Sequence, residues 1–392
     1  MIRLIFSCSI FGYVGCGQAE KSQEDSGVFD EEPSFEDTAQ EPEANPTSEP
    51  TSEPESSPTA EPTSEPAEEP VEEDCPQGVI CTSTFPYSHM GDTSQSTARE
   101  FDSYSCAPST DESGTEIYYR LTIPESGFLA LELSEMESGA DVDVHLLASL
   151  DSGDCIDRGH WLAGSWVTSG TYWVVADSWV NSSGTELSGA YTLRVGLTTE
   201  EDLMAEGIDA DVAEDAIVAF DVAWLNGEIS SFVYSITDFS LHSAQERFWI
   251  YDLAGQELLY NLYVAHGQAS SDSNDASYAS TFSNIPESHQ SSLGMMRGAE
   301  SYTGSFGYSM RIDGLESGFN DNVRPRAIVM HGWEGSRPEY VAQYGMTAPT
   351  LGCPAVDDRE VADVVDLLKD GSGMFFWYPG TSWYSSSEYL GN

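Results

Sequence analysis

Alternating hydrophobic and polar positions dominate the chain between residues 75 and 198. Short alternating segments separated by turns rich in Gly, Ser and Asp are typical of an antiparallel β-sandwich. The predicted strands are Glu116–Ile123, Gly127–Leu133, Asp141–Leu146, Gly170–Ala176 and Gly189–Val195. We therefore expect residues 75–198 to form an N-terminal β-sandwich domain.

The hydrophobic period changes after residue 198. Between residues 200 and 225 the apolar positions recur at helical spacing, which predicts one or two short amphipathic helices. Strand-like patterns then return at Ser230–Leu241, Arg247–Leu253, Leu258–Ala265 and Ala327–Met330. Val361–Leu368 places its apolar residues on one side and is predicted to be a further helix. Residues 199–392 are therefore predicted to be a second, mainly β domain with a few short helices.

Two segments precede these domains. Residues 1–16 carry Arg3 ahead of an apolar run too short for a membrane span, which is the pattern of an export signal. The run ends in Gly15-Cys16 and resembles a bacterial lipobox, so Cys16 is the expected lipidation site; an ordinary cleaved signal peptide is the alternative. Residues 17–74 repeat Thr-Ser-Glu-Pro and predict an extended acidic tether. We expect an exported protein, anchored to a bacterial membrane by lipid and facing the periplasm or cell wall.

Charge and motifs exclude several function classes. The chain holds 67 acidic residues against 14 basic ones, and nucleic-acid binding needs clustered Lys and Arg. Nucleic acid is therefore excluded as a partner. The sequence also lacks Gly-x-Ser-x-Gly, His-Glu-x-x-His, a Walker loop and paired CxxC motifs.

The cysteines divide into a group and a single residue. The four between residues 75 and 155 can form two disulfides in three connectivities once the chain is in an oxidising compartment. Among these we favour Cys75–Cys81 and Cys106–Cys155. Cys353 then has no partner, and an odd thiol in an exported protein is either a buried apolar filler or a reactive group.

Cys353 lies in a segment suited to acyl transfer. Glycine directly before it lets the backbone approach a bound acyl group, and the N–H groups of Leu351, Gly352 and Cys353 could surround an oxyanion. The strand Ala327–Met330 is expected to end next to His331. A thiol near an imidazole is the minimum for nucleophilic acyl transfer, because the imidazole takes the thiol proton and the thiolate attacks a carbonyl.

A series of motifs along the second domain resembles a known family. They are Val264-Ala265-His266-Gly267, Thr281-Phe282-Ser283-Asn284, Ser291-Ser292-Leu293-Gly294, Gly307–Leu315, Gly318–Asn322, Arg326–Gly332 and Gly352-Cys353-Pro354-Ala355. In order and spacing they resemble the catalytic domain family of the murein L,D-transpeptidases, in the subgroup with Gly-Cys-Pro-Ala.

That resemblance implies a role for each central residue. Cys353 would be the nucleophile and His331 its base, and Gly332 would orient the imidazole through its carbonyl. A stem tetrapeptide of peptidoglycan would acylate Cys353 and release its terminal D-alanine, and an amine of a second stem, or water, would then release the acyl group. No metal or organic cofactor is implied.

The substrate-binding residues are less determined. Where the widespread form of the family has a histidine and an arginine near the cysteine, this chain has Leu351 and Ala355. Another group must then hold the substrate carboxylate. The candidates are Arg311, Arg324, Arg326 and Arg337, each with pairing to a local carboxylate as the alternative. His266, Ser283 and Asn284 are further candidates, with structural roles as the alternative.

The leading prediction is thus a cysteine-dependent peptidoglycan L,D-transpeptidase that cross-links stems or exchanges D-amino acids. An L,D-carboxypeptidase or wall hydrolase of the same fold is one alternative. A catalytically silent wall-binding lipoprotein is another.

The first domain also carries a resemblance. Asp141-Val142-Asp143-Val144, Gly170-Thr171-Tyr172-Trp173 and Gly189–Leu193 follow the order of the pre-peptidase C-terminal type of domain, an accessory module of enzymes. Asp141 and Asp143 project from one face of a predicted strand, where they either form a solvated face or help to hold Ca²⁺.

Overall fold

The computed structural model describes residues 75–390. The predicted signal segment 1–16, its Cys16 and the predicted tether 17–74 lie outside the described residues. Between residues 75 and 390, none of the helices is long and apolar enough to cross a membrane. The described chain is mainly β, as the sequence predicted.

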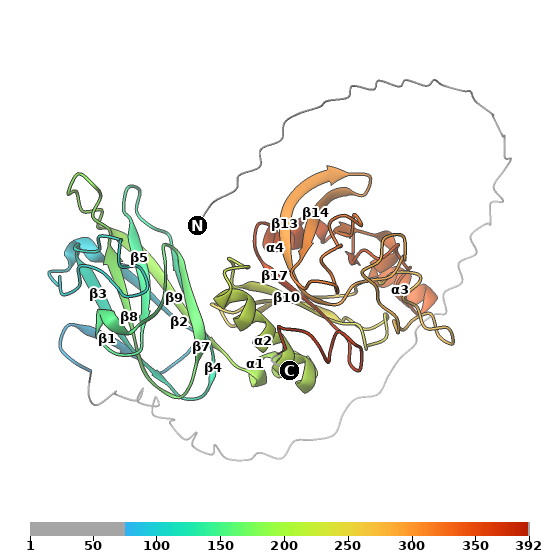
Figure 1. The fold of residues 1–392 in the computed structure, drawn as a ribbon, viewed down its shortest axis with the longest axis horizontal. Coiled ribbons are helices and arrows are strands. Elements are labelled where there is room, and N and C mark those ends of the chain that lie inside the picture. Colours follow the sequence, from blue (N-terminus) through green and yellow to red (C-terminus); the bar gives the residue numbers. More distant parts are fainter. Residues whose placement is uncertain (1–74, 391–392) are drawn as a thin grey trace, which may run out of the picture. The chain divides into compact units, whose positions relative to one another are not determined.

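Residues 79–198 contain two sheets, both drawn in blue to green in Figure 1. One sheet has the order β1 (Val79–Thr82), β3 (Glu116–Ile123), β8 (Gly170–Ser178), β5 (Val142–Leu147) and β6 (Cys155–Gly159). The other has the order β2 (Tyr87–Asp92), β9 (Ala190–Thr198), β4 (Gly127–Ser134) and β7 (Leu162–Val167). Only the β1–β3 pair is parallel.

Alternation along the strands produces the sandwich core. Leu121 and Val144 of the first sheet pack with Leu131 and Val195 of the second, and all four are fully buried. Because successive side chains of a strand point to opposite faces, each strand contributes every second residue to this core. The sandwich prediction therefore agrees with the observed strands.

Asp143 is buried and does not lie on a solvated face. Its side chain is buried, forms an ion pair with Arg158 and lies 3.1 Å from Nδ1 of His160. The solvated-face interpretation is therefore wrong for Asp143, because its carboxylate is buried and paired with Arg158. Asp141, His160 and Asp143 form the one group of His, Cys, Asp or Glu side chains with metal-ligand spacing within residues 75–390.

Both predicted disulfides are present, Cys75–Cys81 and Cys106–Cys155. Cys353 is the free cysteine among the described residues.

The two disulfides are expected to differ in their contribution to stability. The Cys106–Cys155 disulfide closes a loop with a sequence separation of 49, and the Cys75–Cys81 disulfide closes one with a separation of only 6. Replacing both cysteines of a pair by serine opens the corresponding loop. Loop-closure entropy then gives losses of about 4 and about 2 kcal/mol in the free energy of unfolding. Denaturant unfolding of both double variants measures the difference, and an equal or larger loss for the short loop would contradict it.

Two helices lie in the chain between the last strand of the sandwich and the first strand of the eight-stranded sheet. The first, α1 (Glu200–Ala205), begins at a capping box in which Thr199 and Asp202 exchange hydrogen bonds, and α2 (Ala210–Leu225) begins at Asp209. These are the one or two helices expected for residues 200–225.

The third sheet has eight strands and carries the C-terminal half of the chain. Its order is β12 (Glu257–Leu262), β11 (Phe248–Asp252), β10 (Val233–Asp238), β17 (Gly373–Trp377), β13 (Gly294–Gly304), β14 (Gly307–Gly314), β15 (Val329–Gly332) and β16 (Ala355–Val356). The remaining helices are α3 (Pro338–Tyr344), α4 (Val361–Leu368) and the short 3₁₀ helices Thr93–Gln95, Ser152–Asp154 and Glu334–Ser336.

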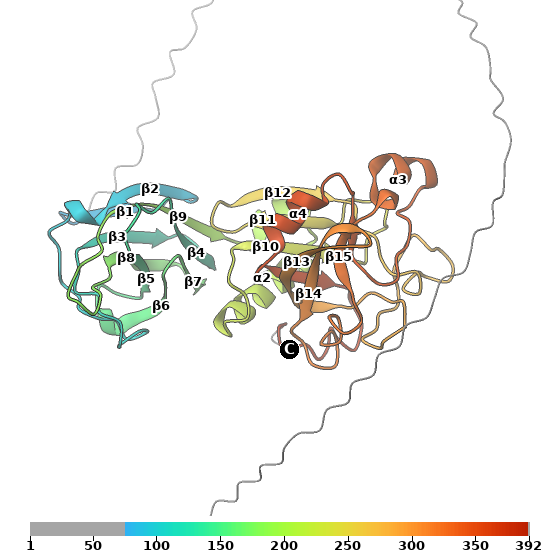
Figure 2. The same cartoon turned by 90° about the horizontal axis from the view of Figure 1, so that it is seen from above.

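The helices α2 and α4 cover opposite sides of the sheet (Figure 1 and Figure 2): α2 packs on β17, β10 and β13, and α4 packs on β14, β13, β10 and β15. The buried face of α2 includes Val212, Ala216 and Phe220, and α4 buries Val364 and Leu368. Their apolar side chains join the same core as the strands. This core fixes the central strands to which the edge strands β14, β15 and β16 attach.

Several predicted strand ends are wrong. The strand expected at Ser230–Leu241 spans only Val233–Asp238. The strand expected at Leu258–Ala265 ends at Leu262, so His266 lies in a loop beyond it. The strand expected at Ala327–Met330 begins only at Val329 and includes His331. Its start is delayed because Ala327 has a left-handed φ of 56°, which interrupts the extended backbone.

Candidate active site

The edge of the eight-stranded sheet brings Cys353 and His331 to one place. In β15, His331 lies opposite Ser309 of β14 on one side and Ala355 of β16 on the other. Cys353 is two residues before Ala355, so the parallel β15–β16 pair places its loop beside the histidine. The pair predicted from distant parts of the sequence thus shares one edge.

His331 is held as a neutral base. Its ring is buried, and Nδ1 lies 2.9 Å from the carbonyl oxygen of Gly332. A carbonyl can only accept, so Nδ1 carries the proton and Nε2 has its lone pair free. Burial lowers the pKa of His331 below its ordinary value of 6.5, against the smaller opposing effect of the Gly332 hydrogen bond. The imidazole is therefore neutral at pH 7, with Nε2 able to accept a proton.

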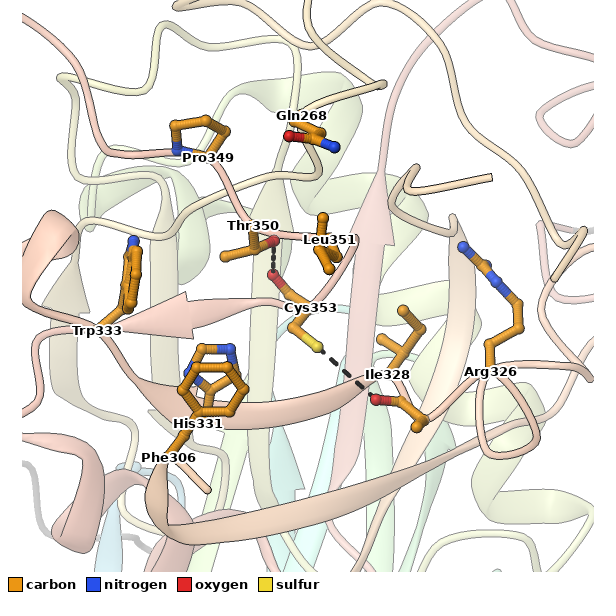
Figure 3. Close-up of a pocket in the computed structure, with 11 residues that line it drawn as sticks. Gln268, Phe306, Arg326, Ile328, His331, Trp333, Pro349, Thr350, Leu351 and Cys353 are labelled. Carbon is orange, nitrogen blue, oxygen red and sulfur yellow. Dashed lines mark hydrogen bonds between the residues drawn. The ribbon is translucent and has the colours of Figure 1, made fainter. Parts of the chain in front are cut away.

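Cys353 carries a protonated thiol in this structure. Its Sγ donates to the carbonyl oxygen of Ala327 at 3.8 Å, the contact drawn as a dashed line from the sulphur of Cys353 in Figure 3. Burial raises the pKa of the Cys353 thiol above 9.0, although a backbone hydrogen bond from Val329 and the charge of Arg326 act in the opposite direction. Within residues 75–390, no hydrogen bond joins Sγ to His331. The thiol must therefore leave Ala327 before the imidazole can take its proton.

The residues before Cys353 form a tight turn that only glycine permits at its centre. Gly352 has a φ of 112°, and a Cβ atom there would lie 2.6 Å from the carbonyl oxygen of Gln290. Thr350 closes the turn, since its hydroxyl accepts from Gly352 N–H at 3.2 Å and donates to the Cys353 carbonyl at 2.7 Å. The Gly352 N–H is thus occupied, which leaves those of Leu351 and Cys353 from the predicted oxyanion hole.

Cys353 and His331 open into one cavity of about 360 Å³. It is shown in Figure 3 and is lined by Gln268, Phe306, Arg326, Ala327, Ile328, His331, Trp333, Pro349, Thr350, Leu351 and Cys353. Most of this lining is apolar, which favours a substrate that leaves water behind as it binds.

Arg326 is the one predicted arginine that reaches the cavity. Its guanidinium donates to the carbonyls of Ser283 and Gln290 at 2.6 Å and to the hydroxyls of Ser292 and Ser288 at 2.6 and 3.1 Å. Among the described residues it forms no ion pair with a carboxylate. Burial lowers its pKa. A guanidinium still stays protonated at pH 7, so the cavity contains one positive charge that no carboxylate of the described residues balances.

The other three candidate arginines pair with local carboxylates, which was the alternative to substrate binding. Arg311 pairs with Glu300, Arg324 with Glu300 and Asp313, and Arg337 with Asp358. None of the three lines the cavity. Their charges are already balanced by local carboxylates.

His266 lies outside the cavity and contacts the turn before Cys353 through its backbone. The buried imidazole accepts from Arg247 at 2.8 Å and lies 3.2 Å from the hydroxyl of Ser271, and burial and Arg247 together lower its pKa to about 3. Its side chain does not line the cavity. Its backbone carbonyl instead accepts from Thr350 N–H at 3.0 Å, so it positions the turn before Cys353.

Ser283 and Asn284 line a separate cavity of about 500 Å³. The side chain of Asn284 donates to Asp321 and accepts from the backbone of Asn322. Ser283 is connected to the Cys353 cavity only through its carbonyl, which accepts from Arg326.

Phe306 is one of the cavity residues that the sequence did not indicate. It lies in the turn between β13 and β14 and stacks on His331, with ring centroids 4.1 Å apart and planes at 17°. An aromatic residue in a turn between two glycines, Gly304 and Gly307, was the available signal.

A free thiol and a neutral imidazole sharing one cavity at the edge of a β-sheet are the groups that a thiol-dependent acyltransferase needs. Residues 204–377 match the family model of the L,D-transpeptidase catalytic domain. The match agrees with the resemblance seen in the sequence motifs, and it supports a catalytic domain of the L,D-transpeptidase type over these residues.

Two solved structures are similar to about a third of the chain. The pre-peptidase C-terminal domain of a collagenase from Bacillus anthracis covers 31% of this chain and 99% of its own, at 12% identity and a TM-score of 0.21. PliG from Aeromonas hydrophila, a periplasmic inhibitor of g-type lysozyme, covers 31% and 96%, at 13% identity and a TM-score of 0.21. No curated protein sequence matches the chain. The pre-peptidase C-terminal assignment of residues 75–198 therefore stays a prediction.

Proposed function

We propose that residues 199–392 catalyse L,D-transpeptidation of peptidoglycan stem tetrapeptides through an acyl-enzyme on Cys353. The observation that carries the proposal is the cavity shared by the free Cys353 thiol and the neutral His331, whose Nδ1 is bound to the Gly332 carbonyl. A thiol and a base in one mostly apolar cavity are the requirements of acyl transfer.

The first half-reaction begins with rotation of the Cys353 thiol from Ala327 towards His331. Nε2 takes the thiol proton, and the thiolate attacks the carbonyl of the third stem residue. The N–H groups of Leu351 and Cys353 then stabilise the oxyanion. When this intermediate collapses, the bond to the terminal D-alanine breaks and His331 returns the proton to the leaving amine. The product is a thioester on Cys353.

The second half-reaction reverses these roles. An amine of a second stem, or a free D-amino acid, loses a proton to His331 as it attacks the thioester carbonyl, and the Cys353 thiol is restored. The amine acceptor gives 3→3 cross-links or exchanged stems. Water in the same place gives an L,D-carboxypeptidase, which is the alternative product of the same acyl-enzyme.

We further propose that the rest of the chain places this domain at the wall. Lipid on Cys16 would hold the protein at a bacterial membrane, the acidic segment 17–74 would act as a spacer, and the sandwich 75–198 would be an accessory module. Radiolabelled palmitate incorporated in the wild type and absent from Cys16→Ala would support the lipid anchor. Equal labelling of the two would overturn it.

Mass spectrometry of tetrapeptide muropeptides tests the reaction. The chain from Cys75 onward is incubated with them, with and without an added D-amino acid, beside a Cys353→Ala variant. Loss of D-alanine together with 3→3 dimers or exchanged stems, absent in Cys353→Ala, is the expected result. Tripeptides alone would identify a carboxypeptidase. Unchanged muropeptides with a folded wild type would favour a silent wall-binding protein.

A further inference from the structure

The exposed ring of Phe306 has no place in the hydrophobic core. The side chain is 52% exposed, and it does not belong to any of the core clusters in residues 75–390. Its ring contacts are with His331, at 4.1 Å between centroids, and with Trp333, at 6.3 Å edge to face. Packing of the fold therefore does not explain this phenylalanine, whereas its contact with the histidine does.

The β13–β14 hairpin delivers Phe306 to that place. Gly304 lies opposite Gly307, so Ser305 and Phe306 form a two-residue turn. Three residues after the ring, Ser309 pairs with His331 itself. The strand register thus fixes the distance between the turn and the histidine. A register shift in β13 between Gly298 and Ser301 adds a local bend to the same hairpin.

Stacking supplies the orientation that a single hydrogen bond does not. The bond from Nδ1 to the Gly332 carbonyl fixes one atom of the imidazole, and the ring plane remains free to tilt about that bond. A phenyl ring at 17° to the imidazole removes this freedom and covers one of its faces. Nε2 lies in the ring plane and stays uncovered. Figure 3 shows the two rings face to face beside Cys353.

We propose that Phe306 is a positioning residue, which holds the His331 imidazole so that Nε2 faces the thiol of Cys353. This inference rests on the proposed acyl-enzyme chemistry but not on peptidoglycan as the substrate. Removal of the ring leaves His331 in place and lets its plane turn. A base misplaced by about 1 Å lowers the rate of proton transfer strongly.

A small activated ester tests the role without any stem peptide. Acylation of Cys353 by p-nitrophenyl acetate releases one nitrophenolate per thiol, and its burst rate measures the first half-reaction. We expect Phe306→Leu to slow the burst about 10- to 100-fold and Phe306→Tyr, which keeps the stacked ring, to restore it. Tyr344→Leu, at an equally exposed aromatic residue on α3, is the matched control and should leave the rate unchanged.

Proton NMR of the His331 ring provides a second readout. In the wild type the Cε1 proton should be shifted upfield by the phenyl ring current, and Phe306→Leu should remove this shift. A normal shift in the wild type, an unchanged burst in Phe306→Leu, or no rescue by tyrosine would overturn the proposal. If the wild type acylates but leaves muropeptides unchanged, the substrate proposal fails and the positioning role stands.

Discussion

Replacement of His331 by glutamine is expected to lower the rate of acyl-enzyme formation on Cys353 roughly 10³-fold, because general base catalysis contributes factors of that order. Glutamine can still donate to the Gly332 carbonyl, so the fold of β15 should persist. The p-nitrophenyl acetate burst measures the loss. His242→Gln is the matched control, since His242 does not line the cavity, and its ring accepts from the backbone of Ala244 and packs edge to face on Tyr278.

The pH profile of the same burst separates loss of the base from loss of structure. Burial lowers the pKa of His331 below 6.5, so the wild-type rate should fall only as the pH drops through a value under 6.5, where the imidazole becomes protonated. In His331→Gln this acid limb should be absent. The thiol must then ionise alone, and because its pKa is raised above 9.0 the rate should keep rising beyond pH 9. A variant that keeps the acid limb would show that another group is the base.

Much of the fold was predictable because burial on one face imposes a period. The observed β3 spans Glu116–Ile123 and α4 spans Val361–Leu368, both as predicted. The strand β17, Gly373–Trp377, was missed because all five of its residues are buried and no alternation remains. The strand β13 was missed as well, since it is interrupted by glycine and by a register shift.

The site residues also divide into those that the sequence could identify and those that it could not. Cys353, His331 and Gly332 could be named because local motifs carry them. The choice among four arginines could not be made from the sequence, because it depends on which carboxylates the fold brings near. Arg311, Arg324 and Arg337 each meet an acid far along the chain or across a strand pair, and Arg326 meets none within residues 75–390. Phe306 was missed for a related reason, since its partner lies 25 residues further on, in a different strand.

Arg326 is expected to bind the terminal carboxylate of the donor stem. Its charge is the one in the cavity without a protein anion, and a substrate carboxylate would complete the ion pair in a mostly apolar setting. Arg326→Met should therefore raise the KM for tetrapeptide about 10- to 100-fold, the range of a charged hydrogen bond. Arg337→Met is the matched control, because Arg337 is paired with Asp358 outside the cavity.

Loss of Arg326 also removes its hydrogen bonds to the segment 283–292, so a raised KM alone would not identify the carboxylate as its partner. A donor whose terminal carboxylate is converted to the amide resolves this. If the Arg326 guanidinium binds the donor carboxylate, amidation should raise the KM of the wild type by the same factor as Arg326→Met does. Amidation should then raise the KM of Arg326→Met very little further. Equal losses on amidation in wild type and variant would place the carboxylate elsewhere and reduce Arg326 to a support for that segment. The comparison therefore separates charge recognition from structure within one set of steady-state measurements.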